Sequence, residues 1–352
     1  EKMKLWTLEP GKILLKFKVF DPEDFSRLQA VEEAKKWIDE RGGVNRVVIK
    51  PDKPGYGKGV GVGGEHFVTL HQAIDHFQSL FGGETRQKVI IEDKVEGEES
   101  SFQTWCDGRN LVPMPETRDY KRAFDGDIGP NTGGMGSYRD VIDHLPFMEE
   151  KDREAEISIT NKLFQRLKLN RGGACLRGTP FYIAFIHTAE GPKILEINSR
   201  PGDPELMAIL PTIGEDFVDI CFDMLHGTLT EVKFLKKSAV VTYAVPLTYG
   251  GYRDQYSGSN EVNLNPAKEL AKSLHGRLRI YPGSMEQRDG FTYALKSRAV
   301  ASVGIGDDIR EAREISLKGV KAIDGPLWNR WDIASEKHIA SCIEHMRILR
   351  CR

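Results

Sequence analysis

The chain has 352 residues, which is enough for two or three domains of about 100 to 200 residues each. Hydrophobic residues make up 39% and charged residues 29%, a composition typical of a globular protein and unlike that of a disordered scaffold. A net charge of −2 and the lack of a basic stripe argue against a nucleic-acid partner. No apolar run reaches the ~18 residues of a spanning helix, and the first residues carry no signal-peptide pattern. With five scattered cysteines and no C-x-x-C pair, the sequence predicts a cytoplasmic protein with reduced thiols and no membrane partner.

The first ninety or so residues alternate predicted helices and short strands. Residues 22–41 form an amphipathic helix pattern that stops at Gly42-Gly43, with one stripe made of Leu28, Val31, Ala34 and Ile38. Strands are predicted at 47–50, 59–62 and 89–92, and a helix follows the capping-box pair Thr69 and Gln72. A glycine-rich turn joins the first two strands as a hairpin with a flexible tip.

The rest of the chain predicts two further units. Residues 94–235 contain a polar loop at 118–136, a long helix near 149–169, a hairpin with strands at 182–187 and 193–197, and two helices that end at His226. The last unit contains strands at 239–245, 293–296 and 299–303 and a helix capped by Asp307 or Asp308. The predicted class is α+β, divided into 1–45 (a linker or helical remnant), 46–93 (a small flap subdomain), 94–235 (a larger subdomain) and 236–352 (a smaller C-terminal α/β domain).

The segment 194–200 alternates apolar and polar residues, so Glu196, Asn198 and Arg200 are expected on one face of a strand. A carboxylate beside a carboxamide oxygen suits Mg²⁺, and a guanidinium can bind phosphate or carboxylate through two parallel hydrogen bonds. An ordinary half-solvated strand explains the spacing as well. Asp203 and Pro204 fit a helix N-cap and first helical position, although a helix start there could also hold an anionic or amino-acid substrate.

The run from Gly55 to Gly64 contains six glycines, which let backbone amides approach phosphates, and Lys58 adds a positive charge. Its G-x-G-x-x-G match is weak, because the preceding strand ends too early and no crossover unit follows. A phosphate-covering flap and a plain flexible hairpin both stay open. Lys50, at the end of the preceding strand, could reach a nucleotide phosphate or be an ordinary exposed lysine.

Taken in order, these motifs resemble the ATP-grasp superfamily and, within it, the phosphoribosylamine-glycine ligase family. The segments that carry the resemblance are the lysine strand Val48-Ile49-Lys50, the loop Gly57-Lys58-Gly59-Val60, the hinge from Val89 to Glu99, the block Asp119-Tyr120-Lys121-Arg122, Asp127 and Gly129-Pro130-Asn131-Thr132-Gly133-Gly134-Met135-Gly136, the metal strand Glu196-Ile197-Asn198, and the turn Arg200 with Gly202-Asp203-Pro204-Glu205. The block from Asp119 to Gly136 is the most specific of them. The resemblance extends from about residue 16 to Arg330-Trp331-Asp332-Ile333.

The resemblance implies two α+β subdomains that clasp ATP, and a ligase that joins glycine to phosphoribosylamine through a glycyl phosphate in purine biosynthesis, as a monomer or small homo-oligomer. It implies ATP contacts for Lys50, Gly57, Lys58, Gly59, Glu92, Asp93, Val95, Glu98 and Glu99. Substrate contacts are implied for Pro130, Asn131, Thr132, Gly133, Gly134, Arg200, Gly202 and Asp203. Catalytic roles are implied for Lys121, Arg200 and Asp203, and Mg²⁺ or Mn²⁺ binding for Glu196 and Asn198.

This sequence departs from the family pattern at some points. The family has a glycine-rich α/β domain ahead of this region, and nothing before residue 16 resembles it, so either this sequence leaves the domain out or this homologue lacks it. Tyr120 also stands where the family has a histidine. Two alternatives follow: a diverged ATP-grasp ligase with another amine, or a non-catalytic ATP-binding homologue, against which the retention of Glu196, Asn198, Lys50 and Lys121 argues.

Overall fold

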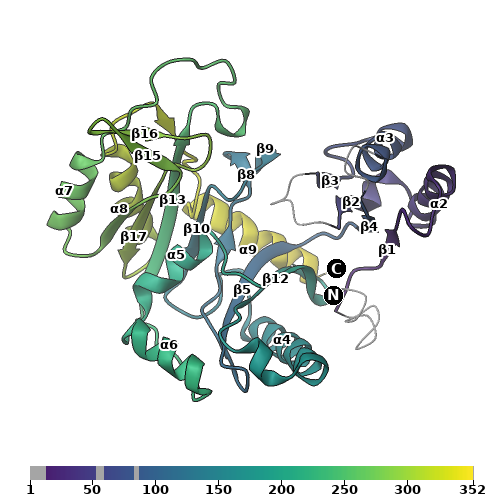
Figure 1. The fold of residues 1–352 in the computed structure, drawn as a ribbon, viewed down its shortest axis with the longest axis horizontal. Helices are drawn as coiled ribbons and strands as arrows, with labels where there is room; N and C mark the ends of the chain where they lie inside the picture. Colours follow the sequence, from purple (N-terminus) through teal and green to yellow (C-terminus); the bar gives the residue numbers. More distant parts are fainter. Residues whose placement is uncertain (1–12, 53–58, 83–86, 352) are drawn as a thin grey trace. The chain divides into compact units, whose positions relative to one another are not determined.

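The computed structural model describes residues 13–52, 59–82 and 87–351, and the chain forms two compact units, Glu1–Glu96 and Gly97–Arg352 (Figure 1). The α+β class predicted from the sequence is confirmed, and every pairing between the labelled strands is antiparallel. The four predicted ranges stay a prediction, since contacts alone separate the chain only at residue 96.

The first unit is a four-stranded sheet with two helices. Its elements are β1 (Phe17–Phe20), α2 (Arg27–Glu40), β2 (Val47–Pro51), β3 (Gly61–Val62), α3 (Leu70–Phe81) and β4 (Val89–Asp93). The strand order is β1-β4-β2-β3, and one core contains side chains from the sheet and from both helices. Thr69 and Gln72 form the predicted capping box at the start of α3. Leu28, predicted on the buried stripe of α2, is instead 82% exposed.

The second unit begins with the elements β5 (Glu98–Cys106), β6 (Leu111–Pro113), β7 (Arg118–Asp119), β8 (Arg122–Phe124), β9 (Ile128–Asn131), β10 (Gly136–Arg139), α4 (Glu150–Arg171), β11 (Phe181–Thr188), β12 (Gly191–Asn198), α5 (Glu205–Ile209) and α6 (Phe217–His226). It continues with β13 (Ser238–Pro246), α7 (Asn265–Ser273), β14 (Leu278–Pro282), β15 (Met285–Arg288), β16 (Phe291–Ala294), β17 (Val300–Gly306), α8 (Ile309–Lys321), β18 (Leu327–Trp328) and α9 (Glu336–Arg350).

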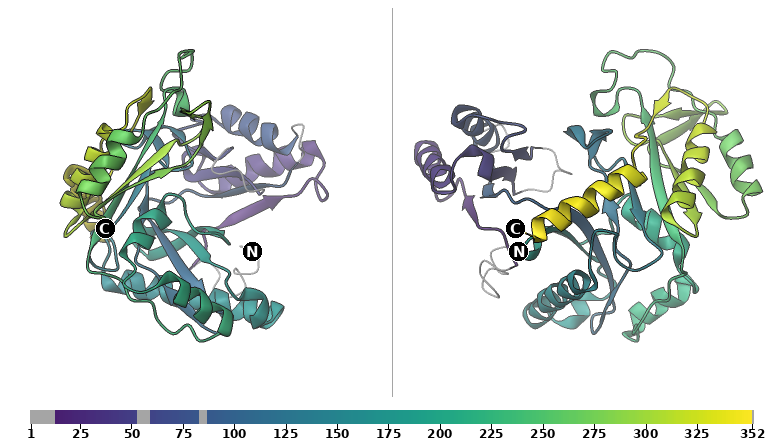
Figure 2. Two further views of the ribbon diagram at one scale, coloured as in Figure 1. Left: turned by 60° about the vertical axis from the view of Figure 1, so that its left-hand side comes forward. Right: turned by 180° about the vertical axis from the view of Figure 1, so that it is seen from behind.

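Two sheets organise this second unit. One has the order β12-β11-β5-β6, and the other has the order β14-β17-β13-β10-β7 with β18 paired to β13. The second sheet joins strands from both sides of residue 235, and one core includes Tyr138, Val241, Val303 and Met346. Helix α9, yellow in Figure 2, supplies the last of these and carries the chain back to β5 and β11. The C-terminal strands and helix therefore help to hold the loop between β7 and β10.

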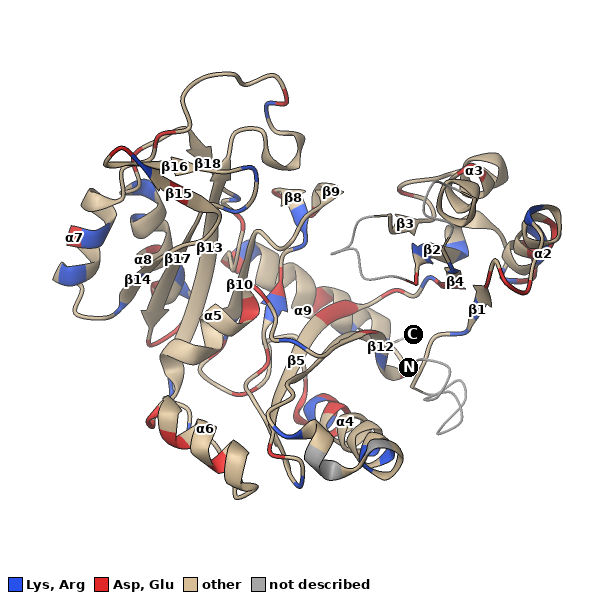
Figure 3. Cartoon of the chain, viewed as in Figure 1, with Lys and Arg blue, Asp and Glu red and all other residues tan. Residues whose placement is uncertain are grey.

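Charges of both signs are interspersed along the described elements (Figure 3). Among the described residues, no helix combines the length and the apolar character that crossing a membrane requires.

Candidate active site

One face of β5 gathers three segments that the sequence singled out. Side chains two residues apart on a strand share a face, and here these are Glu99, Ser101 and Gln103. Glu99 Oε2 accepts a hydrogen bond from Lys121 Nζ at 2.8 Å. Ser101 Oγ donates to Glu205 Oε1 at 3.2 Å, and Gln103 Oε1 accepts from the Gly202 amide at 2.8 Å. The face of β5 therefore anchors both the 119–136 block and the 202–205 turn.

Lys121 lies among carboxylates. Burial disfavours its charged form, but the carboxylates of Glu99, Asp119 and Glu196 outweigh that effect and raise the pKa of Lys121. Burial also opposes ionisation of Glu99, yet the Lys121 ammonium lowers the pKa of that carboxyl on balance. Lys121 therefore stays protonated at neutral pH.

Glu196 and Asn198 lie at the end of β12, as the strand spacing predicts. The Asn198 side-chain amide donates to Glu196 Oε1 at 3.1 Å, and the Glu196 residue is exposed. Within the described ranges no three His, Cys, Asp or Glu side chains form a preformed metal cluster. A carboxylate and a carboxamide at contact distance fit Mg²⁺ or Mn²⁺, since Mg²⁺ bound with a nucleotide takes one or two protein ligands and fills its other positions with phosphate oxygens and waters.

Arg200 lies beyond the end of that strand. Strand β12 ends at Asn198, and the chain bends at residues 199–200. The Arg200 guanidinium is exposed and donates to the Pro201 carbonyl oxygen at 2.9 Å. The structure thus brings Glu196 and Asn198 together on the strand, and the convergence of Arg200 with them stays a prediction.

Asp203 is not the helix cap that its sequence context predicts. Pro204 occupies the N-cap position of α5, and α5 has no side-chain cap. The Asp203 carboxylate binds Arg298 instead, with Oδ2 2.8 Å from Nη2, and also accepts from the Tyr243 hydroxyl at 2.9 Å. The ion pair with Arg298 thus takes precedence over the local capping preference.

The glycine-dense loop passes close to this pair. Gly134 has φ +100°, and a Cβ there would lie 2.6 Å from Asp119 Oδ1 and 2.6 Å from Pro204 Cδ. Only glycine fits at such a position. The Thr132 hydroxyl donates to the Lys121 carbonyl oxygen at 2.9 Å and accepts from the Gly134 amide at 3.1 Å. Residues 132–134 and 203–204 are therefore neighbours, whereas Pro130 and Asn131 lie on the β8–β9 hairpin, where Pro130 is exposed.

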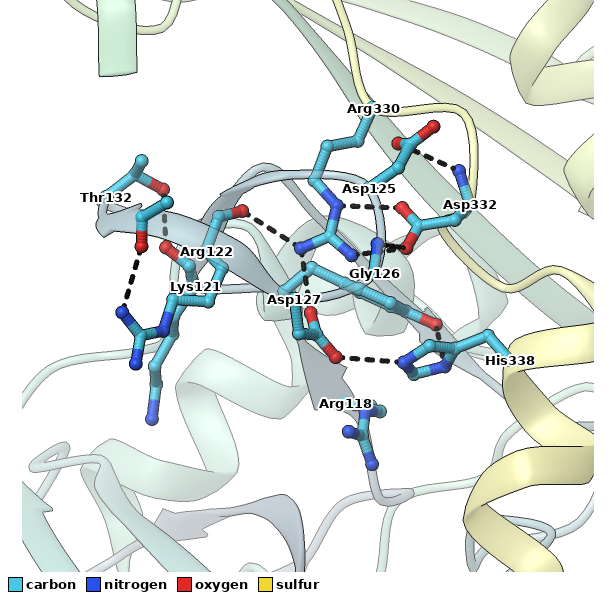
Figure 4. Close-up of polar contacts among 12 residues, drawn as sticks. Arg118, Lys121, Arg122, Asp125, Gly126, Asp127, Thr132, Arg330, Asp332 and His338 are labelled. Carbon is cyan, nitrogen blue, oxygen red and sulfur yellow. Dashed lines mark hydrogen bonds and ion pairs between the residues drawn. The ribbon is translucent and has the colours of Figure 1, made fainter. Parts of the chain in front are cut away.

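Arg330 holds that hairpin in place (Figure 4). Its guanidinium is fully buried and donates to Asp332 Oδ1 at 2.8 Å, to the Arg122 carbonyl oxygen at 2.9 Å and to Asp127 Oδ1 at 2.8 Å. Tyr120, the departure from the family pattern, points into the same buried region, where its hydroxyl accepts from the Ala334 amide at 2.8 Å. The Tyr120 side chain therefore supports the loop from the core.

The Asp119 Oδ1 atom is buried from solvent and has no hydrogen-bond partner among the described residues. Burial, followed by the carboxylates of Glu205 and Glu99, raises the pKa of Asp119 well above its usual value, against the opposing charges of Lys121 and Arg298. A raised carboxyl pKa means that the folded state is stabilised below the unfolded pKa of about 4, and that this stability is lost as pH rises through the folded pKa.

Asp119→Asn is therefore expected to raise the free energy of unfolding at pH 8 by about 1 kcal/mol relative to wild type, with a smaller gain at pH 5. The physical reason is that the amide cannot ionise and so avoids the cost of a buried negative charge. Urea unfolding at the two pH values measures it. Asp308→Asn, at the exposed N-cap of α8, is the control and should keep the wild-type pH dependence. An equal gain at both pH values would contradict the prediction.

In the first unit, the structure brings together two of the residues that the resemblance assigns to ATP binding. Lys50, at the end of β2, forms an ion pair with Glu92 on the neighbouring β4. Burial raises the pKa of Asp93 on the same strand. Gly59 has φ +81°, as a tight turn requires. Gly57 and Lys58, and with them most of the predicted flap tip, lie outside the described residues.

Glu98 and Glu99 have different surroundings, although they are adjacent. Glu98 is buried, accepts from Arg118 Nη1 at 2.5 Å, and lies 2.6 Å from His345 Nδ1. The Glu99 side chain is 43% exposed and pairs with Lys121. Of the two, only Glu99 has a carboxylate that a bound molecule can approach.

Two arginines of this site carry no recognisable signal in the sequence. Arg330 lies at the end of the family resemblance with no role implied there, and Arg298 lies in none of the predicted motifs. Arg298 stands in an ordinary Lys-Ser-Arg stretch, so no local pattern could have marked it. Its partner Asp203 is 95 residues away in sequence.

Comparison with known proteins identifies the family of the chain. The family model described as phosphoribosylglycinamide synthetase, ATP-grasp (A) domain, matches residues 12–206. The phosphoribosylamine–glycine ligase of Methanocella arvoryzae is 36% identical over 99% of this chain and 76% of its own length. That of Thermococcus kodakarensis is 34% identical over 98% of this chain and 75% of its own length.

Solved structures give the same relationship. The crystal structure of the phosphoribosylamine–glycine ligase from Thermotoga maritima matches with a TM-score of 0.74 and 25% identity, over 94% of this chain and 77% of that one. A biotin carboxylase domain from Hydrogenobacter thermophilus, crystallised with MgADP, shares the fold with a TM-score of 0.64 and 14% identity, over 98% of this chain and 68% of that one. The chain therefore belongs to the phosphoribosylamine–glycine ligase family of ATP-grasp enzymes.

Proposed function

We propose that the residues gathered on the face of β5 carry out the ATP-dependent joining of glycine to phosphoribosylamine, which yields glycinamide ribonucleotide, ADP and phosphate. The observation that carries the proposal is the clustering of Lys121, Glu99 and Glu196 in one unit. This cluster joins a protonated amine and a candidate metal ligand, which would stabilise the charge of a transferred phosphoryl group, to a candidate ribose ligand, which would help to bind the nucleotide.

In the first step, a terminal oxygen of the glycine carboxylate would attack the γ-phosphorus of ATP, giving glycyl phosphate and ADP. Lys121 would stabilise the charge on the transferred group, since its raised pKa keeps it protonated. Glu196 and Asn198 would hold Mg²⁺ or Mn²⁺, which when bound neutralises phosphate charge. Glu99 would bind the ribose hydroxyls, and Glu98 is the weaker candidate because Arg118 and His345 already hold its carboxylate.

In the second step, the amine of phosphoribosylamine would attack the carbonyl carbon of glycyl phosphate, and phosphate would leave as the new C–N bond forms. The loop from Pro130 to Gly134 and the turn with Arg200, Gly202 and Asp203 would hold the two substrates. The proximity of Gly134 to Pro204 supports this assignment. Positioning and charge stabilisation account for the catalysis, so no side-chain nucleophile is needed.

For the first unit, we propose that Lys50, Gly57, Lys58 and Gly59 contact the nucleotide phosphates and that the segment Glu92, Asp93 and Val95 contacts adenine. The pairing of Lys50 with Glu92 supports a shared role for β2 and β4. Lys50 would then exchange its carboxylate partner for a phosphate when ATP binds.

The proposal is tested by ADP release from the purified chain supplied with ATP, Mg²⁺ and glycine, with phosphoribosylamine generated in place from ribose 5-phosphate and ammonia. The expected result is ADP release that requires all of these components and a product with the mass of glycinamide ribonucleotide. Release that is unchanged when phosphoribosylamine is replaced by another amine would instead support a diverged ligase. Absence of ADP release with every amine would support a non-catalytic homologue.

A further inference from the structure

Arg298 contacts two segments that share no helix or strand, the loop at 133–134 and the turn at 202–203. It lies between β16 and β17, and its Nη1 donates to the Asp203 carbonyl oxygen at 2.9 Å and the Gly134 carbonyl oxygen at 3.3 Å. Nη1 and Nη2 also contact the Asp203 carboxylate, at 3.2 Å to Oδ1 and 2.8 Å to Oδ2. One planar guanidinium thus binds the backbone of both segments and a carboxylate at the same time.

The surroundings of Arg298 fix its orientation. Its guanidinium lies over the ring of Tyr243, 4.8 Å from the centroid, and its side chain is only 16% exposed. The Tyr243 hydroxyl donates to Asp203 Oδ1, so the carboxylate is held from two sides. A Cβ on Gly133 would lie 3.1 Å from the guanidinium, which means that the loop packs directly against it.

These contacts change the role expected for Asp203. Its carboxylate, which the family resemblance assigns to substrate, already has two protein partners, Arg298 and Tyr243, and so also holds the turn in place. The glycine loop and the turn have few side chains with which to hold their own shape, because residues 133, 134 and 202 are glycines. Their relative position therefore depends on contacts from outside, and Arg298 supplies one that binds both segments directly.

We propose that Arg298 is a positioning residue for the substrates: with Asp203, it sets the Gly133-Gly134 loop and the 202–203 turn at the spacing that glycine and the amine require. The inference rests on the proposed assignment of these two segments to the substrates. Arg298 acts through the loop and the turn, and among the residues that the structure describes none of its hydrogen bonds reaches those assigned to ATP.

A double-mutant cycle of Asp203→Asn and Arg298→Gln tests this. Each single variant is expected to raise the KM for glycine and lower kcat/KM for glycine by about tenfold, while the KM for ATP stays within about twofold. The double variant should lose little more than either single variant, because both changes remove the same contact. Arg298→Lys should recover little, since one ammonium cannot reach two carbonyls and a carboxylate together. Arg310→Gln, an exposed arginine on α8, is the matched control.

Three results would overturn the inference. These are wild-type kinetics for Arg298→Gln, losses that multiply to about a hundredfold in the double variant, or an equal rise in the KM values for ATP and glycine. Urea unfolding of wild type, the two single variants and the double variant measures the coupling between Arg298 and Asp203 without any turnover. Additive shifts in the unfolding midpoint would also contradict the inference. Lack of activity in the wild-type protein would count against the proposed function alone. Non-additive shifts in the unfolding midpoint would still show that Arg298 and Asp203 stabilise the fold together.

Discussion

Glu196→Gln is expected to lower kcat at least about a thousandfold and to abolish the dependence of nucleotide affinity on Mg²⁺. The reason is that Glu196 supplies the only formal negative charge of the proposed metal pair with Asn198, and an amide in its place is a much weaker ligand for a hard cation. ADP release under saturating glycine and phosphoribosylamine measures the first effect. Calorimetry of ATP binding with and without Mg²⁺ measures the second.

The control for this experiment lies on the same hairpin. Glu190 in the β11–β12 turn pairs with Lys193 on its own hairpin, and its side chain is 80% exposed, so Glu190→Gln should retain activity within about twofold of wild type. A loss of less than about tenfold in Glu196→Gln, together with an unchanged effect of Mg²⁺, would remove Glu196 from the metal site.

Lys121→Met is expected to lower kcat by about a hundredfold or more while leaving the melting temperature within a few degrees of wild type. The ammonium of Lys121 interacts with the carboxylates of Glu99, Asp119 and Glu196, and methionine carries no charge that could replace it. Stability should change little, because the Glu99 side chain is 43% exposed and water can solvate its carboxylate once the lysine is gone.

Lys121→Arg should restore part of the rate, because it keeps a positive charge at the same place but changes its shape. Lys318→Met, on the exposed side of α8, is the control and should behave as wild type. If Lys121→Met turned over at the wild-type rate, the ammonium would have only a structural pairing with Glu99. A large fall in melting temperature would equally argue for a structural role.

Much of the local structure and part of the candidate site follow from the sequence, because their causes are local. The capping box of Thr69 and Gln72 starts α3 as predicted, since its hydrogen bonds span only three residues. Strand alternation likewise places Glu196 and Asn198 on one face of β12 and at hydrogen-bonding distance. The order of the motifs also sufficed to predict the family, which the comparisons confirm.

Only the tertiary structure decided how the 132–134 loop and the 202–203 turn are held. Arg298 and Asp203 are 95 residues apart, and Arg330 and Asp127 are 203 apart, so no periodicity or spacing rule could pair them. Asp203 shows the physical reason most clearly: its local context favours a helix cap worth about 1 kcal/mol, but a partly buried guanidinium offers two charge-assisted hydrogen bonds instead. The raised pKa of Asp119 has the same origin, because its burial and the nearby carboxylates of Glu205 and Glu99 both arise only in the folded chain.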